Sequence, residues 1–167
     1  MLIGLSGKAG SGKDTVGACL VEKHGFQRHA FADAVRHLAK SIGWDGMKDE
    51  RGRATLITIG MAGREYAADF WVSVLWGMLE GRHGPRPTEW PNIVITDVRF
   101  PNEARWVRNN CGRLWRVDGR QAVVSAGVAA SESETALDDY KFEATIVNNG
   151  DIAQLRGLVE CALLGQQ

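Results

Sequence analysis

The chain has 167 residues, which is enough for one domain with a hydrophobic core. Its 20 Lys and Arg residues balance its 20 Asp and Glu residues, so the formal net charge is zero. This balance argues against broad binding to nucleic-acid polymers or membrane surfaces, which requires excess positive charge. Three widely spaced cysteines, Cys19, Cys111 and Cys161, indicate a reducing compartment rather than a disulfide framework or a metal site. Because no signal-peptide or transmembrane pattern is present, we expect a soluble, cytoplasmic protein.

Apolar periodicity and turn formers predict strands that alternate with helices along the chain. Strands are predicted at residues 2–6, 26–31, 93–96, 114–117 and 145–147. Helices are predicted at residues 13–23, 33–43, 70–79 and 102–110, with a short helix near residue 131 and a final helix after residue 151. The segment 54–61 fits a helix or a strand, and we favour a helix. Loops are predicted at residues 44–53 and 81–92.

The final helix is predicted to bury one of its faces. Its predicted buried face consists of Ile152, Leu155, Leu158 and Val159.

A glycine-rich segment, residues 7–15 with the sequence GKAGSGKDT, lies between the first strand and the first helix. Its spacing fits the phosphate-binding pattern G-x-x-x-x-G-K-[ST], except that Asp14 replaces the hydroxyl residue. Glycines let successive N–H groups turn inward around an anion, and the following helix N-terminus adds partial positive charge. Lys13 supplies a full charge for the outer phosphates. We therefore prefer a triphosphate-binding loop (P-loop) to a glycine-rich turn with a solvated lysine.

The alternation of strands and helices predicts an α/β fold, a three-layer parallel sheet of about five strands flanked by helices. We expect one domain over residues 1–167, with a short lid around residues 118–130, where small residues predominate. Ligands of such sheets bind beyond the carboxyl ends of the strands. The P-loop, Asp97 and the loop that begins at Asp118 should therefore share one cleft.

Asp97 and Arg99 directly follow the apolar strand at residues 93–96. In P-loop proteins a carboxylate at this place can hold or orient magnesium, and we favour that role over a turn or helix-capping aspartate. Arg99 can grip a phosphate bidentately, although a surface arginine has the same sequence context. Asp14 can ligate magnesium or cap its helix, and both roles stay open. Thr15 can donate to a phosphate oxygen.

Further cations are needed because phosphoryl transfer spreads negative charge over the moving group. For each remaining candidate, a solvated surface position is an equal alternative; the candidates are Arg36, Arg64, Arg116 and Arg120. Six tryptophans are many for this length. Trp71 and Trp76 fall in an apolar helix, which favours a place in the core over stacking on a base.

Several segments together resemble the deoxynucleoside monophosphate kinases of bacteriophages. The specific ones are SGKDT at residues 11–15 and TDVRFPNEA at residues 96–104. The supporting segments are FAD at 31–33, GR at 63–64, DFWV at 69–72, SE at 133–134 and VNNG at 147–150. The resemblance covers nearly the whole chain. It implies the nucleoside-monophosphate-kinase version of the P-loop fold and the use of ATP and Mg²⁺ to phosphorylate a deoxynucleoside monophosphate.

The resemblance also assigns residues to each side of the reaction. The ATP phosphates and magnesium would be held by Gly10, Ser11, Gly12, Lys13, Asp14 and Thr15, with Arg116 and Arg120 at the lid. The acceptor nucleotide would face Asp33, Arg64, Asp97 and Arg99. To these we add Arg36, which stands where the family more often has lysine, and Trp71. The catalytic set would be Lys13, Arg64, Asp97 and Arg99, and the metal ligands Asp14 and Asp97. Ser131 stands where the family often has histidine.

Two other functions fit the same residues. One is a P-loop kinase for another small phosphorylated acceptor, like the phosphomevalonate or dephospho-coenzyme A kinases. The other is a non-catalytic nucleotide-binding regulatory module, which we favour less because the chain has no Asn-Lys-x-Asp base-reading segment. The expected partners are ATP and a deoxynucleoside monophosphate, with no nucleic-acid polymer and no membrane. If the protein is phage-encoded, it would act in the cytoplasm of the infected cell. The accepted base is undetermined, and a homodimer stays open.

Overall fold

The fold is built on one sheet of five parallel strands, seen in a computed structural model that describes residues 1–47, 49–119 and 132–165. The strands lie in the order β2-β3-β1-β4-β5. Their bounds are β1 (Leu2–Ser6), β2 (Gln27–His29), β3 (Ile93–Ile95), β4 (Arg113–Gly119) and β5 (Ala144–Asn148). All four neighbouring pairs are parallel. The predicted parallel α/β sheet of about five strands is therefore confirmed.

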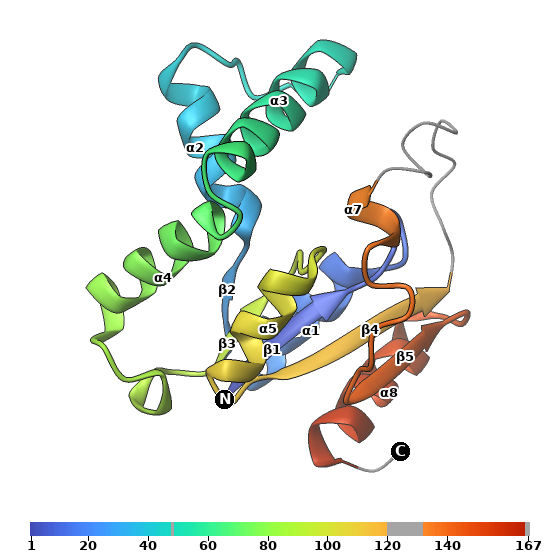
Figure 1. Cartoon of the computed structure of the whole chain (residues 1–167). Coiled ribbons are helices and arrows are strands. Elements are labelled where there is room, and N and C mark those ends of the chain that lie inside the picture. The colour runs from blue at the N-terminus through green and yellow to red at the C-terminus, as the bar shows by residue number, and fades with distance from the viewer. Residues whose placement is uncertain (48, 120–131, 166–167) are drawn as a thin grey trace.

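Helices cover both faces of this sheet and extend beyond one of its edges (Figure 1). Their bounds are α1 (Lys13–His24), α2 (Phe31–Ser41), α3 (Glu50–Tyr66), α4 (Phe70–His83), α5 (Pro101–Asn109), α7 (Glu132–Thr135) and α8 (Ile152–Leu164), with a 3₁₀ turn η1 at Pro87–Glu89. Helices α1 and α8 pack on one face, and α4 and α5 pack on the other. The three predicted layers are thus present.

Apolar side chains of the central strands alternate between two cores, one on each face of the sheet. Ile3 and Leu5 of β1 and Val94 of β3 belong to the core under α1 and α8. Ile93 and Ile95 belong to the core under α4 and α5. Neighbouring residues of a strand point to opposite faces, so a strand covered on both faces must be apolar throughout. This requirement explains why β1 and β3 are continuous apolar runs.

Helix α3 is the element that differs most from the sequence prediction. We expected a loop to residue 53 and a helix over residues 54–61, whereas α3 has 17 residues and begins at Glu50. The side chain of Asp49 caps it by accepting from the Gly52 N–H at 2.7 Å. Because α3 packs mainly against α2 and α4, Ile57 and Met61 stay exposed. A helix with so little buried surface carries no clear apolar stripe, which explains the ambiguous pattern.

The buried face of α8 was only half correctly predicted. Leu155 and Val159 are buried as expected, together with Ala162. Ile152 and Leu158 are 60% and 39% exposed, because the helix turns Ala162 and not these two side chains toward β5. The predicted lid at residues 118–130 lies almost wholly outside the described residues.

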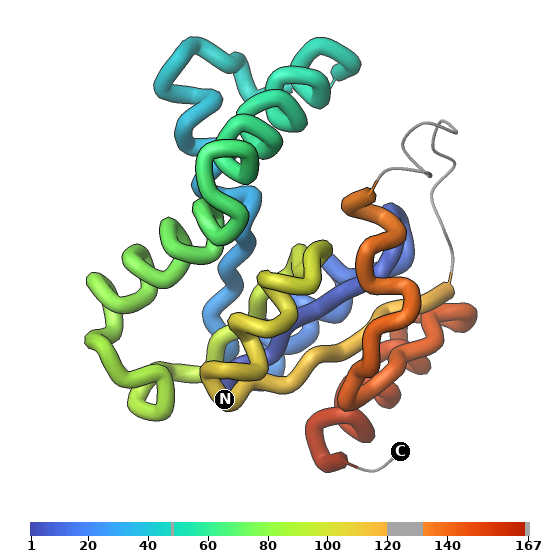
Figure 2. The backbone as a smooth tube through the Cα atoms, in the orientation of Figure 1, coloured from blue at the N-terminus to red at the C-terminus, as the bar shows by residue number. Residues whose placement is uncertain are grey.

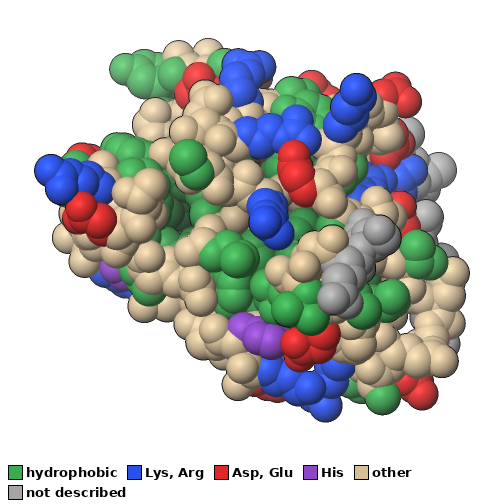
Figure 3. Space-filling model, turned by 90° about the horizontal axis from the view of Figure 1, so that it is seen from below, with side chains coloured by type: hydrophobic (Ala, Val, Ile, Leu, Met, Phe, Trp, Pro, Cys, Tyr) green, Lys and Arg blue, Asp and Glu red, His purple; other side chains and the backbone are tan. Residues whose placement is uncertain are grey.

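Charges of both signs are mixed on the surface. Figure 3 views the molecule from below and shows Lys and Arg side chains interspersed among acidic, apolar and neutral ones. Among the described residues, no helix combines the length and the apolar character needed to cross a bilayer.

Gly63 permits the close packing of α3 on α4, and this packing generates a stability prediction. A Cβ at Gly63 would lie 2.7 Å from the Trp71 ring, whose Nε1 donates to the Gly60 carbonyl at 2.9 Å. We expect Gly63→Ala to lower the free energy of unfolding by about 1–2 kcal/mol, because overpacking outweighs the gain in helix propensity. Gly77→Ala is the matched control: a Cβ there meets nothing within 4 Å. It should stabilise α4 by about 0.5–1 kcal/mol. Urea denaturation measures both, and equal effects would contradict the packing argument.

Candidate active site

The P-loop has the backbone geometry of an anion cradle. Gly7 and Gly12 have φ values of 150° and 103°, which side-chain-bearing residues rarely adopt. A Cβ at Gly7 would lie 2.3 Å from the Val117 carbonyl oxygen, and one at Gly12 would lie 2.3 Å from Asn148 Nδ2. Among the described residues, the buried Ser11 hydroxyl has no hydrogen-bond partner. The cradle, with a buried hydroxyl still free to donate, fits the phosphate groups of a nucleotide.

Lys13 turns back into the loop that it follows. Its Nζ donates to the carbonyl oxygens of Gly7 at 2.6 Å and Lys8 at 2.7 Å. Burial, aided by the nearby positive charge of Arg99, lowers the pKa of Lys13 to about 8. The side chain is therefore held inside the cradle, where its ammonium lies beside any bound phosphate.

Asp14 and Thr15 lie exposed in the first turn of α1. Within the described parts of the chain, the Asp14 carboxylate accepts no hydrogen bond, and the N-cap position is Gly12. The described residues also contain no cluster of three or more His, Cys, Asp or Glu that would hold a metal alone. Mg²⁺ in kinases is usually held by one or two carboxylates together with phosphate oxygens and water. A free carboxylate beside the cradle fits that requirement.

Asp97 caps helix α2. Its Oδ1 accepts from the Phe31 N–H at 2.8 Å, and its Oδ2 accepts from the Ala32 N–H at 2.9 Å. Burial raises the pKa of Asp97, although the two amide hydrogen bonds oppose that shift. Helix capping is thus the role that the structure displays, which the sequence analysis ranked second. Its role as a magnesium ligand stays a prediction.

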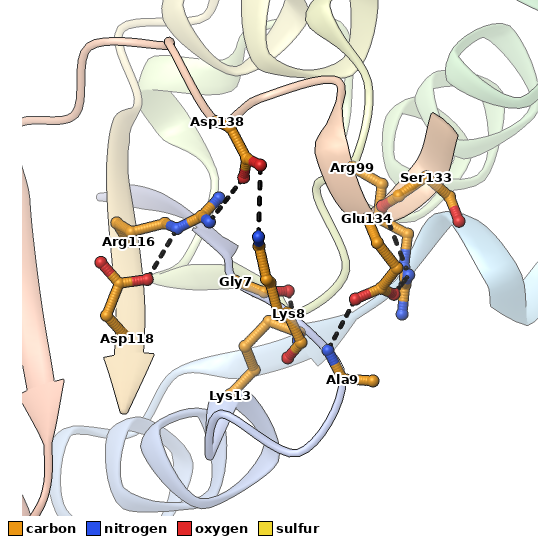
Figure 4. Close-up of polar contacts among 10 residues, drawn as sticks. All are labelled: Gly7, Lys8, Ala9, Lys13, Arg99, Arg116, Asp118, Ser133, Glu134 and Asp138. Atoms are coloured by element: carbon orange, nitrogen blue, oxygen red, sulfur yellow. Dashed lines mark hydrogen bonds and ion pairs between the residues drawn. The ribbon is translucent and has the colours of Figure 1, made fainter. Parts of the chain in front are cut away.

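Arg99 is linked to the P-loop by Glu134, whose carboxylate accepts hydrogen bonds from both. Arg99 Nη1 donates to Glu134 Oε1, and the Ala9 N–H of the P-loop donates to Glu134 Oε2 at 2.7 Å (Figure 4). From the sequence, Glu134 was expected only to help cap a short helix near residue 131 and was given no role at the active site. The Ser133-Glu134 pair was visible in the sequence, but the contacts of Glu134 with Ala9 and Arg99 join distant segments and could not be read from it.

A second acidic residue of the same segment joins the P-loop to β4. Asp138 pairs with Lys8 at 3.2 Å and with Arg116 at 3.0 Å, and Arg116 also pairs with Asp118 at 2.9 Å. Figure 2 shows that the chain before β5 runs beside the P-loop, although the two are far apart in sequence. Arg116 is therefore close to the cradle, and its role on the ATP side stays a prediction. Arg120 lies outside the described residues.

Arg64 extends from α3 to Phe100, in the loop that follows β3. Its guanidinium carbon lies 4.6 Å from the centre of the Phe100 ring. Next to it, Glu103 accepts from the N–H groups of Arg99 at 2.7 Å and Phe100 at 3.1 Å. Burial raises the pKa of Glu103 to about 8, aided by the negative charge of Asp97 and opposed by Arg64. From the sequence alone, Glu103 had no predicted role.

The other candidate acceptor residues are placed differently. Asp33, in the first turn of α2, is paired with Arg28 and with Arg36, each at 2.7 Å. The charge of Arg36 is therefore partly neutralised by a neighbour on its own helix. Trp71 is buried between α3 and α4 against Gly63. This placement agrees with the core role, so we leave Trp71 out of the proposed acceptor site.

A cavity of about 540 Å³ adjoins the P-loop at the end of β5. Its lining includes Asn148, whose Nδ2 donates to the Ser11 carbonyl at 3.0 Å, and the side chains of Val147 and Leu158. In the sequence, the VNNG segment at residues 147–150 had no assigned ligand. The cavity has the apolar walls and the few polar groups that a flat base requires.

Comparisons with known proteins agree with this fold, although no family model matches the sequence. The protein "Putative deoxynucleotide monophosphate kinase" of Acanthamoeba polyphaga mimivirus is 28% identical over 92% of this chain and 91% of its own length. The "Uncharacterized protein ORF77" of Ictalurid herpesvirus 1 is 29% identical over 96% of this chain and 69% of that protein. Both are relatives across nearly the whole chain.

Among solved structures, TT1252 from Thermus thermophilus superposes with a TM-score of 0.59 at 18% identity, covering 99% of this chain and 97% of that one. Shikimate kinase from Aquifex aeolicus superposes with a TM-score of 0.54 at 13% identity, with the same coverage of each chain. Together with the parallel sheet and the cradle, these similarities show that the chain has the fold of the P-loop kinases.

The buried carboxyl of Glu103 generates a prediction on pH. Its pKa is about 8 in the folded protein against an ordinary value of 4.5, so the folded protein holds a proton that the unfolded chain releases. The resulting stabilisation is fully present below pH 4.5 and is lost as the pH rises through 8. The free energy of unfolding should therefore fall with rising pH in this window, by at most about 1.4 kcal/mol per pH unit.

Glu103→Gln removes this titration and keeps the shape of the neutral side chain. We expect its stability to depend less on pH than that of the wild type between pH 5 and 8, measured by urea denaturation. Glu65→Gln, an exposed position on α3, is the control and should follow the wild-type curve. Parallel curves for wild type and Glu103→Gln would show that Glu103 is ionised in the folded protein.

Proposed function

We propose that the protein is an ATP-dependent deoxynucleoside monophosphate kinase. The observation that carries the proposal is the junction of a phosphate cradle with a second cationic group: Ala9 of the P-loop and Arg99 share the Glu134 carboxylate. A kinase with a phosphorylated acceptor needs two anion sites side by side. The printed name of the mimivirus relative supports a deoxynucleoside monophosphate as that acceptor.

The proposed reaction is an in-line phosphoryl transfer. An oxygen of the acceptor monophosphate attacks the γ-phosphorus of ATP, and the bond from that phosphorus to the β–γ bridging oxygen breaks, which leaves ADP and a nucleoside diphosphate. The attacking oxygen already carries negative charge, so no strong general base is required. Catalysis then consists of positioning the two substrates and neutralising charge.

Each part of the site has a proposed task in this reaction. Lys13 and the P-loop amides hold the ATP phosphates, and Asp14 contributes an oxygen ligand to magnesium, which neutralises charge on those phosphates when bound. Arg99 and Arg64 bind the acceptor phosphate. The cavity beside Asn148 receives the base of ATP. The acceptor base lies toward α2 and α3, which extend beyond the carboxyl end of β2 (Figure 1).

The test is a coupled assay with ATP, Mg²⁺ and each of the four deoxynucleoside monophosphates. We expect diphosphate formation with at least one of them, and Lys13→Ala should lower kcat by at least about 100-fold. Lys23→Ala, an exposed lysine at the other end of α1, should retain the wild-type rate. Phosphomevalonate and dephospho-coenzyme A complete the panel. Turnover of one of these alone would replace the proposed substrate class, and no turnover at all would refute kinase activity on these acceptors.

Arg99 is expected to act on the acceptor rather than on ATP. Loss of a charge-assisted bond to the acceptor phosphate costs about 1.5–3 kcal/mol. Arg99→Ala should therefore raise the KM of the acceptor by about 10- to 100-fold, with a smaller change in the KM of ATP. Arg105→Ala, an exposed position on α5, is the matched control. If only the KM of ATP rose, Arg99 would belong to the ATP side.

A further inference from the structure

We infer that Glu134 is a positioning residue, which holds the guanidinium of Arg99 against the P-loop so that the acceptor phosphate meets the γ-phosphate of ATP. This inference rests on the proposed function. It adds a residue that lies in neither the phosphate-binding motif nor the loop after β3 that carries Arg99.

The Glu134 carboxylate bridges two loops that are distant in the sequence. One oxygen accepts from the Ala9 N–H in the loop after β1, and the other accepts from Arg99 in the loop after β3. The side chain is 5% exposed, so both bonds form away from water. Figure 4 shows Ala9 and Arg99 converging on it. A buried carboxylate with one ionic and one amide partner is a strong link, because losing either partner leaves buried charge unsatisfied.

The segment that carries Glu134 is itself fixed at two points. Leu137 is 3% exposed and belongs to the core beneath α4 and α5. Asp138 pairs with Lys8 and Arg116 on the far side of the P-loop. Moving the backbone of this segment away from the loop would expose Leu137 and break these ion pairs. Glu134 therefore acts as a fixed support rather than as a latch that opens when a phosphate arrives.

Arg99 is held at both of its ends. Glu103 accepts from its backbone N–H at 2.7 Å, and Glu134 accepts from Nη1, which also lies 3.5 Å from the Ser133 carbonyl oxygen. Within the described structure, no hydrogen bond engages Nε or Nη2, so these donors stay free for a phosphate. A guanidinium offers five donors in a rigid fork, so one edge can be fixed while another binds.

Like charge makes this support necessary. Arg99 lies close enough to Lys13 to help lower the pKa of Lys13. Without the carboxylate between the P-loop and Arg99, the two cations would repel each other, and the flexible Arg99 side chain would turn toward solvent. The P-loop itself would keep its glycine geometry and Lys13. Loss of Glu134 should therefore impair the transfer step and acceptor binding more than the binding of ATP.

The test compares Glu134→Gln with Glu132→Gln, an equal change on the same short helix. Glu132 is exposed, and among the described residues its side chain has no hydrogen bond or ion pair. Misplacement of a reacting group by about 1 Å lowers the rate by about 100-fold, so we expect a kcat loss of this order for Glu134→Gln. Its KM for ATP should stay within about threefold of wild type. Glu132→Gln should match the wild type.

A double-mutant cycle separates positioning from a general structural effect. If Glu134 acts through Arg99, then Arg99→Ala and Arg99→Ala/Glu134→Gln should have the same kcat/KM, because the second change removes nothing further. Additive losses would overturn the inference. A lower KM for ATP in Glu134→Gln would also overturn it, because that result would mean the carboxylate competes with phosphate. Wild-type kinetics in Glu134→Gln would likewise overturn the inference.

Two additional measurements keep the outcome decisive. Thermal unfolding checks that Glu134→Gln is folded; if it is not, Glu134→Asp retains the charge but is too short to reach both partners, and its rate should fall in the same direction. NMR spectra report the link without turnover: ATP should shift the Ala9 amide and the Arg99 Nε–H signals in the wild type, but only the Ala9 signal in the variant. An equal Arg99 response in both overturns the inference. Absence of turnover in the wild type overturns the proposed function instead.

Discussion

Hydrogen bonds from backbone amides to buried or half-buried carboxylates hold the functional edge of this protein together. Asp97 accepts from the first amides of α2, Glu103 from the amides of Arg99 and Phe100, and Glu134 from the P-loop amide of Ala9. Each bond joins a loop at the end of one strand to another loop or helix. The parallel sheet brings these loops to one edge, and the carboxylates fix their positions there.

This arrangement has an electrostatic cost that the protein balances locally. Burial raises the pKa values of Asp97 and Glu103, so carboxyl groups placed in this edge tend to hold protons or to need cationic partners. Arg64 and Arg99 supply nearby positive charge, and Glu134 and Asp138 in turn lie beside Lys13 and Lys8. A chain with zero net charge thus builds a strongly charged site from closely paired groups. Its cations are held in place by acids before any phosphate binds.

The predictions that succeeded came from patterns in which neighbours along the chain decide the structure. The apolar runs of β1 and β3 and the glycine spacing of the P-loop are of this kind, because strand burial and loop geometry are set locally. The predicted extent of α3 and the predicted burial of Leu158 were wrong, because each depends on which surface the helix packs against. Both carboxylate oxygens of Asp97 cap α2, and its position at the end of a strand could not reveal this contact.

The sequence by itself determined the class of fold and the phosphate cradle, since a strand, a glycine-rich turn with Lys13 and a helix suffice to form an anion site. Only the tertiary structure decided which groups meet that cradle. Glu134 is 125 residues from Ala9 and 35 from Arg99, and it joins them because the chain returns over the edge of the sheet before β5. Such contacts depend on the paths of whole strands and loops, and no local spacing encodes them. The sequence therefore identified the glycine-rich loop that forms the cradle, and the fold identified the residues that hold the neighbouring arginine in place.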